Sequence, residues 1–131
     1  MDQVKREYLG HWLYKANEDV QVFEELLSKE PEHYTGAICF HAQQAVEKFL
    51  KSFLIYHDAE FRKVHDLDYL LAECKKREGR AFESIDLRSL TDYGVSIRYA
   101  DDFVIPSIDD TKYYCGVALE IKRIVDDRIK L

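Results

Sequence analysis

The chain has 131 residues, of which 47% are hydrophobic and 34% are charged, with only 5 Gly and 2 Pro. This length and composition predict a compact helical protein and exclude a disordered chain or a turn-rich β protein. The net charge of −6 argues against broad, non-specific attraction to nucleic acid, which depends on lysine and arginine, but it leaves room for a local basic patch.

The first two predicted helices are long. Apolar residues three and four positions apart, from Leu9 to Leu27, predict an amphipathic helix over about residues 7–28. Pro31 closes the connection that follows. A second helix, over about residues 34–56, is apolar around most of its circumference, as expected for the most buried helix of a bundle.

Three further helices follow in the second half of the chain. One is predicted to begin with Asp66 as its N-cap and to end at Gly79. The next is predicted over about residues 86–99, and the last begins with Ser107 as its N-cap and extends through Ile129. Short connections between these helices predict an all-α, antiparallel up-and-down bundle of about five helices.

Residues 1–131 are expected to form a single domain. The three cysteines, at positions 39, 74 and 115, lie far apart among apolar residues, so we expect reduced thiols rather than disulfides. The N-terminus has no apolar signal-peptide core, and no run of 18 apolar residues occurs. We therefore expect a cytoplasmic protein that does not contact a membrane.

Residues 40–51 of the second predicted helix combine core residues with a charged strip. On a helical wheel, His41, Gln44, Lys48 and Lys51 fall within roughly 80° of one another. These side chains suit the lining of a groove for an anion. They equally suit a solvated flank whose lysine stems cover apolar neighbours, and the pattern alone favours the flank.

The common signatures of enzymes are absent from the sequence, including Gly-rich phosphate loops and the usual zinc and serine-hydrolase motifs. Cys39 and His41 are two residues apart on a helix, so they diverge by about 160° and do not suggest a metal site. No cofactor is expected. His65 could act as an acid or base beside Asp66, but a structural role at the start of the helix is favoured.

Arg98 and Tyr99 stand beside two carboxylates at the end of the helix predicted over residues 86–99. The planar guanidinium of Arg98 suits a phosphate. An internal ion pair with Asp101 or Asp102 is the favoured alternative.

Four groups of residues resemble one family when they are taken together: Trp12, Ala16 and Asp19; residues 40–51 with their Gln-Gln-Ala-x-Glu-Lys core; His65, Asp66 and Leu67; and Arg98 with Tyr99. In this combination and order the chain resembles the HEPN domain, whose name refers to nucleotide binding in higher eukaryotes and prokaryotes. The resemblance spans nearly the whole chain.

The resemblance implies a helical bundle similar to the helical domain of nucleotidyltransferases such as the kanamycin enzyme, and often a homodimer. In one branch of the family, metal-independent ribonuclease toxins use an Arg followed after four to six residues by a His. In the other, a small HEPN protein is encoded beside a minimal nucleotidyltransferase in a toxin-antitoxin-like system. It binds nucleotide or serves as the partner subunit.

The sequence departs from the ribonuclease branch at its catalytic motif. Counting from Arg98 leads to positions 103–105, which hold Phe, Val and Ile, and no histidine follows His65. General acid-base cleavage needs a group that exchanges a proton near neutral pH, which these side chains lack. Arg6 and His11 match the spacing, but they diverge by about 140° on the first helix, so we interpret that match as chance.

We therefore predict a non-catalytic protein that binds a nucleotide or a small anionic ligand, forms a homodimer and associates with a nucleotidyltransferase partner. The alternatives are a ribonuclease toxin, with RNA as a less favoured ligand, and a purely structural assembly partner. The expected ligand contacts come from the second helix and from the segment opposite it: His41, Gln44, Lys48, Lys51, Arg98 and Tyr99.

Overall fold

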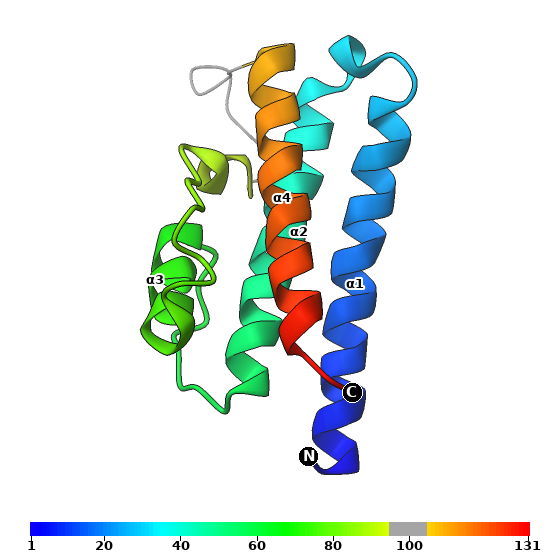
Figure 1. Cartoon of the computed structure of the whole chain (residues 1–131). Coiled ribbons are helices and arrows are strands. Elements are labelled where there is room, and N and C mark those ends of the chain that lie inside the picture. Colours follow the sequence, from blue (N-terminus) through cyan, green and yellow to red (C-terminus); the bar gives the residue numbers. More distant parts are fainter. Residues whose placement is uncertain (95–104) are drawn as a thin grey trace.

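The computed structural model describes residues 1–94 and 105–131, and these residues form helices, turns and loops without strands. The all-α prediction is thus confirmed (Figure 1). The elements are α1 (Gln3–Leu27), η1 (Pro31–His33), α2 (Thr35–Tyr56), α3 (Leu67–Glu78), η2 (Leu90–Gly94) and α4 (Ile108–Arg128), of which η1 and η2 are short 3-10 helices.

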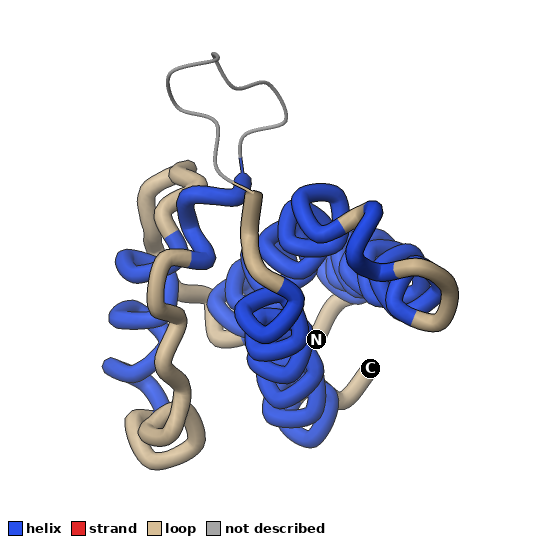
Figure 2. Tube along the Cα trace, turned by 90° about the horizontal axis from the view of Figure 1, so that it is seen from above, coloured by secondary structure: helices blue, strands red, loops and turns tan. Residues whose placement is uncertain are grey.

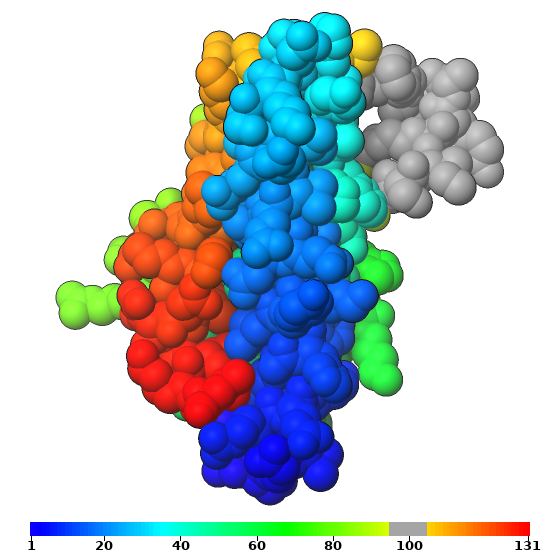
Figure 3. All heavy atoms as spheres, turned by 90° about the vertical axis from the view of Figure 1, so that its right-hand side faces the viewer, coloured from blue at the N-terminus to red at the C-terminus, as the bar shows by residue number. Residues whose placement is uncertain are grey.

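Helix α2 is the centre of the bundle, because α1, α3, α4 and η2 all pack against it. Helix α1 runs antiparallel to both α2 and α4, and α3 lies on the far side of the bundle from α1 (Figures 1 and 2). On the face that Figure 3 shows, α1 extends over the whole length of the molecule, with α2 on one side and α4 on the other.

Aromatic side chains from α2 fill the interior. Phe49 and Phe53 are fully buried, and the ring of Phe53 meets that of Phe82 edge to face, with ring centroids 5.2 Å apart. Phe82 comes from the connection after α3, so this contact ties that connection to the central helix. The expectation that the second helix is the most buried one is confirmed by its fourteen buried residues.

The two N-caps predicted in the second half of the chain are confirmed. A side-chain oxygen of Asp66 accepts hydrogen bonds from the backbone N–H groups of Asp68 and Tyr69, at 2.9 and 3.3 Å. The hydroxyl of Ser107 accepts one from the N–H of Asp110, at 3.0 Å. Each cap satisfies a helix N–H group that would otherwise have no partner.

Replacing Ser107 with alanine should lower the free energy of unfolding by about 1 kcal/mol, because α4 loses its capping acceptor. Urea denaturation measures this change. Ser84 is an exposed serine whose side chain forms no hydrogen bond to any described residue, and Ser84→Ala should change stability by less than about 0.5 kcal/mol. Equal effects of the two substitutions would show that the cap contributes nothing.

The helix predicted over residues 86–99 is not an α-helix in its described part, which contains turns and η2. Leu87 and Leu90 are buried, so the apolar positions were right. However, Arg88 has a φ of 47°, in the left-handed region, and its N–H donates to the side chain of Asp86 instead of to a helical carbonyl. This local hydrogen bond competes with a helical turn. Residues 95–99 lie outside the described residues.

Candidate functional site

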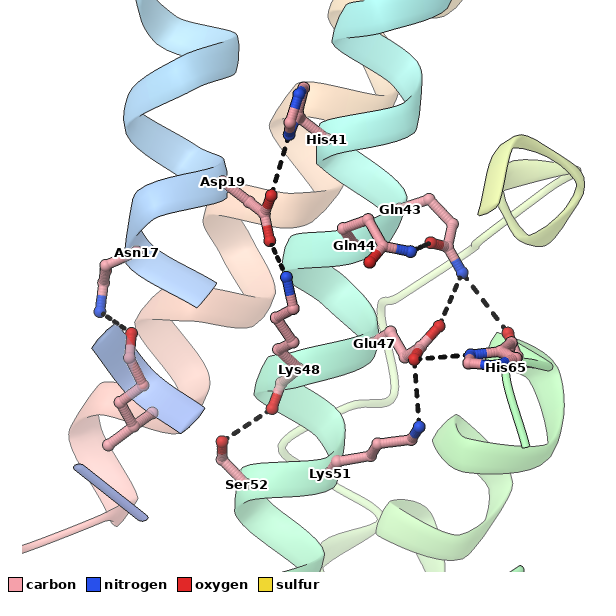
Figure 4. Close-up of polar contacts among 11 residues, drawn as sticks. Asn17, Asp19, His41, Gln43, Gln44, Glu47, Lys48, Lys51, Ser52 and His65 are labelled. Atoms are coloured by element: carbon pink, nitrogen blue, oxygen red, sulfur yellow. Dashed lines mark hydrogen bonds and ion pairs between the residues drawn. The ribbon is translucent and has the colours of Figure 1, made fainter. Parts of the chain in front are cut away.

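Asp19 of α1 binds two residues of the predicted strip on α2. Its carboxylate lies 2.9 Å from Nδ1 of His41 and 2.5 Å from Nζ of Lys48 (Figure 4). The Asp19 side chain is only 11% exposed, whereas those of His41 and Lys48 are 29% and 21% exposed. One nearly buried carboxylate thus joins α1 to α2 and partly neutralises the charged strip.

Glu47 forms a second cluster on another side of α2 (Figure 4). Its buried carboxylate accepts hydrogen bonds from Nζ of Lys51 at 3.0 Å and from Nε2 of Gln43 at 3.2 Å, and it lies 2.9 Å from Nδ1 of His65. Gln43 in turn accepts a hydrogen bond from Gln44 at 2.8 Å. Lys51 is itself buried, so it does not belong to a solvated flank.

The pKa of Glu47 is set by two opposing influences. Burial raises it, but the hydrogen bonds from His65 and Lys51 and the charge of Lys51 together outweigh burial and lower the pKa below its ordinary value of 4.5. Glu47 is therefore held as a carboxylate at neutral pH.

This lowered pKa predicts a pH dependence of stability. The Glu47 carboxyl releases its proton more readily in the folded chain than in the unfolded chain. Its contribution to folding stability is therefore fully present above about pH 4.5 and is lost as the pH falls through the lower pKa of the folded state. Melting temperatures measured from neutral to acidic pH should show wild type losing its advantage over Glu47→Gln below about pH 4.5. A difference between the two proteins that stays constant over this range would contradict the assignment.

Two adjoining hollows are lined by residues of α1 and α2, and one of them also by the segment that follows α2. Tyr8 and Trp12 of α1 line both hollows. One has a volume of about 440 Å³ and is also lined by His11, Lys15 and Lys48. The other has a volume of about 310 Å³ and is also lined by Lys51, Ile55, Phe61 and Lys63. We refer to the two hollows together as the Trp12 groove.

Aromatic rings and ammonium groups meet in the Trp12 groove. The rings of Tyr8 and Trp12 are 6.3 Å apart at an angle of 83°, and Nζ of Lys51 lies 5.8 Å from the centre of the Trp12 ring. Lys15 and Lys63 are exposed, and within residues 1–94 and 105–131 no carboxylate forms an ion pair with either. Such a surface suits a planar ligand that carries negative charge.

The Trp12 groove is locally basic although the chain is acidic overall. Four lysines line it, and two of them, Lys48 and Lys51, are paired with Asp19 and Glu47. Four positive charges against two negative ones leave an excess of two. This excess contrasts with the net charge of −6 for the whole chain.

The six residues predicted to contact a ligand do not all line the groove. Lys48 and Lys51 line the groove, whereas His41 and Gln44 are bonded within the bundle and line neither hollow. Arg98 and Tyr99 lie outside the described residues. The sequence interpretation did not assign ligand contacts to the α1 side of the groove or to the segment after α2. The spacing of four and three residues from Tyr8 to Trp12 to Lys15 was the available signal.

In the part of the chain that the structure describes, no three His, Cys, Asp or Glu side chains are grouped so that they could hold a metal ion. Among the same residues, no helix combines the length and the apolar character needed to cross a membrane.

These features define a protein class: an all-helical bundle whose central helix carries polar clusters and borders an aromatic, basic groove. The chain belongs to the HEPN domain family, because the sequence model of that family matches residues 9–128. No curated protein and no solved structure matches the chain. The resemblance predicted from the sequence is therefore confirmed, and the family suggests a function related to nucleotides or RNA.

Proposed function

We propose that this HEPN-family protein binds a nucleotide, or a similar planar anion, in the Trp12 groove and does not cleave it. The observation that carries the proposal is that the single tryptophan of the chain lies in a groove lined by four lysines. Any nucleobase can stack on an aromatic ring, and ammonium groups bind phosphate. The groove offers both contacts side by side.

Internal pairing of two lysines does not prevent this role. An ammonium group has three N–H donors, and Lys48 directs one of them to Asp19 and Lys51 one to Glu47. Within residues 1–94 and 105–131 no other acceptor of the chain binds these two ammonium groups, so we expect their remaining donors to bind a phosphate in the groove. Lys15 adds an exposed ammonium group to the hollow that Lys48 lines. His41 lines neither hollow, and it shares the Asp19 carboxylate with Lys48.

A binding role is favoured over cleavage by the surroundings of His11, which lines the groove. His11 is the only histidine among the lining residues, and histidine is the residue type most often used as a general acid or base. Arg6, the residue that matches the family's catalytic spacing with His11, donates instead to the backbone carbonyl of Leu131 at 3.1 Å. RNA incubated with the protein should remain intact, and cleavage that disappears in His11→Ala would overturn the non-catalytic assignment.

The proposal includes self-association and a nucleotidyltransferase partner. Support for a contact surface comes from apolar and aromatic side chains on the outside of α1, where Val4, Tyr8 and Tyr14 are 79%, 51% and 69% exposed. Light scattering should give the mass of a dimer, and a nucleotidyltransferase encoded by the neighbouring gene should co-purify with this protein. A monomer that retains no such partner would leave only the ligand-binding role.

Calorimetric titration with ATP, GTP and 5′-AMP tests the ligand-binding role. Lys15→Ala should weaken binding at least about tenfold, because a charge-assisted hydrogen bond contributes about 1.5–3 kcal/mol and about 1.4 kcal/mol corresponds to a factor of ten. Lys15 pairs with no carboxylate of the described residues, so this variant should fold normally. Lys75 is an exposed lysine of α3, and Lys75→Ala is the matched control, with unchanged affinity. No binding by wild type, or equal effects of the two substitutions, would overturn the proposal.

A further inference from the structure

The division of the Trp12 groove into two hollows points to a more specific ligand. Each hollow contains two lysines, and the two aromatic rings are common to both. We infer that the groove binds one nucleoside that carries phosphate on both its 3′ and its 5′ oxygen, and this inference rests on the proposed function. The matching chemistry is a nucleoside 3′,5′-bisphosphate or an internal nucleotide of a single strand.

The order of the lining residues along the helices supports this arrangement. Lys48 and Lys51 are three residues apart on α2, so their backbones are offset by roughly 4.5 Å along the helix axis. Lys48 lines the hollow that contains Lys15, and Lys51 lines the hollow that contains Lys63. The two hollows are therefore lined by different pairs of lysines, and Trp12 lines both.

The sizes of the hollows agree with a ligand that occupies both. Volumes of about 440 and 310 Å³ each fall at the small end of the range for ligand pockets, roughly 300–1,000 Å³. A nucleoside monophosphate with its base against Trp12 would place phosphate in one hollow and leave the exposed lysine of the other hollow, Lys15 or Lys63, without a phosphate partner. A second phosphate would bind that lysine and add its attraction.

Titration with three adenosine ligands tests the inference: the 5′-monophosphate, the 3′-monophosphate and the 3′,5′-bisphosphate. The bisphosphate should bind at least about tenfold more tightly than either monophosphate, since one charge-assisted contact accounts for that factor. Lys15→Ala and Lys63→Ala should each remove this advantage. Lys15→Ala should weaken only the 5′-monophosphate and Lys63→Ala only the 3′-monophosphate, and Lys75→Ala should weaken neither.

The outcomes separate this inference from the proposed function. If the monophosphates bind and the bisphosphate binds no more tightly, the inference is overturned while the nucleotide-binding role stands. If none of the three ligands binds, the proposed function fails. A trinucleotide that binds as tightly as the bisphosphate identifies a single strand as the source of the chemistry, and a trinucleotide that does not bind identifies the free bisphosphate.

Discussion

Replacing Glu47 with alanine is expected to lower the free energy of unfolding by about 3 kcal/mol, because removing one member of a buried ion pair leaves an uncompensated charge. The unpaired charge would be that of Lys51, whose side chain is 10% exposed. The amide of Gln43, a residue with no exposed surface, would lose an acceptor as well. Urea denaturation of the purified variant measures the change.

Two further variants show whether the charge or the side-chain volume of Glu47 is responsible. Glu47→Gln keeps the volume and one acceptor oxygen, so its loss of stability should be smaller than that of Glu47→Ala. The double variant Glu47→Leu with Lys51→Met removes both charges and should recover most of the loss, since apolar residues of similar volume often replace a buried pair without cost. A loss below about 1 kcal/mol in Glu47→Ala would show that the cluster does not stabilise the fold.

Replacing Asp19 with alanine is expected to have opposite effects on folding and on binding. The chain should become less stable by about 2–3 kcal/mol, because Lys48 and His41 both lose their carboxylate partner, although they are partly exposed. The same change removes a negative charge next to the Trp12 groove, so nucleotide affinity should rise about threefold to tenfold. Thermal denaturation and calorimetric titration measure the two effects on the same sample.

Asp126 provides the matched control for Asp19. It also pairs with a lysine, Lys122 of α4, but its side chain is 44% exposed, and such surface pairs contribute about 0–1 kcal/mol. Asp126→Ala should leave both stability and affinity close to those of wild type. If Asp19→Ala weakened binding, the carboxylate would be needed to position the groove and would not compete with the ligand for Lys48.

The helices were predictable from the sequence wherever local signals agreed with one another. Asp66 and Ser107 are N-caps in the structure, as predicted. An N-cap can be predicted from the sequence because its side chain accepts a hydrogen bond from an N–H group only two or three residues later in the chain. The prediction of a helix over residues 86–99 was wrong for the residues that the structure describes, 86–94. The left-handed conformation of Arg88 and the buried positions of Leu87 and Leu90 depend on packing, which periodicity does not contain.

The candidate site was predictable only in part. A helical wheel placed Lys48 and Lys51 on one strip, and both line the groove. The wheel contains no information about α1, so it could not show that the Asp19 carboxylate binds both His41 and Lys48. The pair of Glu47 and Lys51, four residues apart, was visible in the sequence. Its burial was not, because burial depends on which other segments cover that side of α2.

The fluorescence of the single tryptophan tests the central claim most directly, because Trp12 is the only source of that signal in the chain and lies in the groove. Titration of wild type with 5′-AMP should quench the emission and saturate, and equal concentrations of inorganic phosphate or ribose 5-phosphate should quench it far less. Lys15→Ala should shift the midpoint of the titration to higher concentration, and Lys75→Ala should not. Binding of 5′-AMP detected by calorimetry with no change in Trp12 emission would contradict the account.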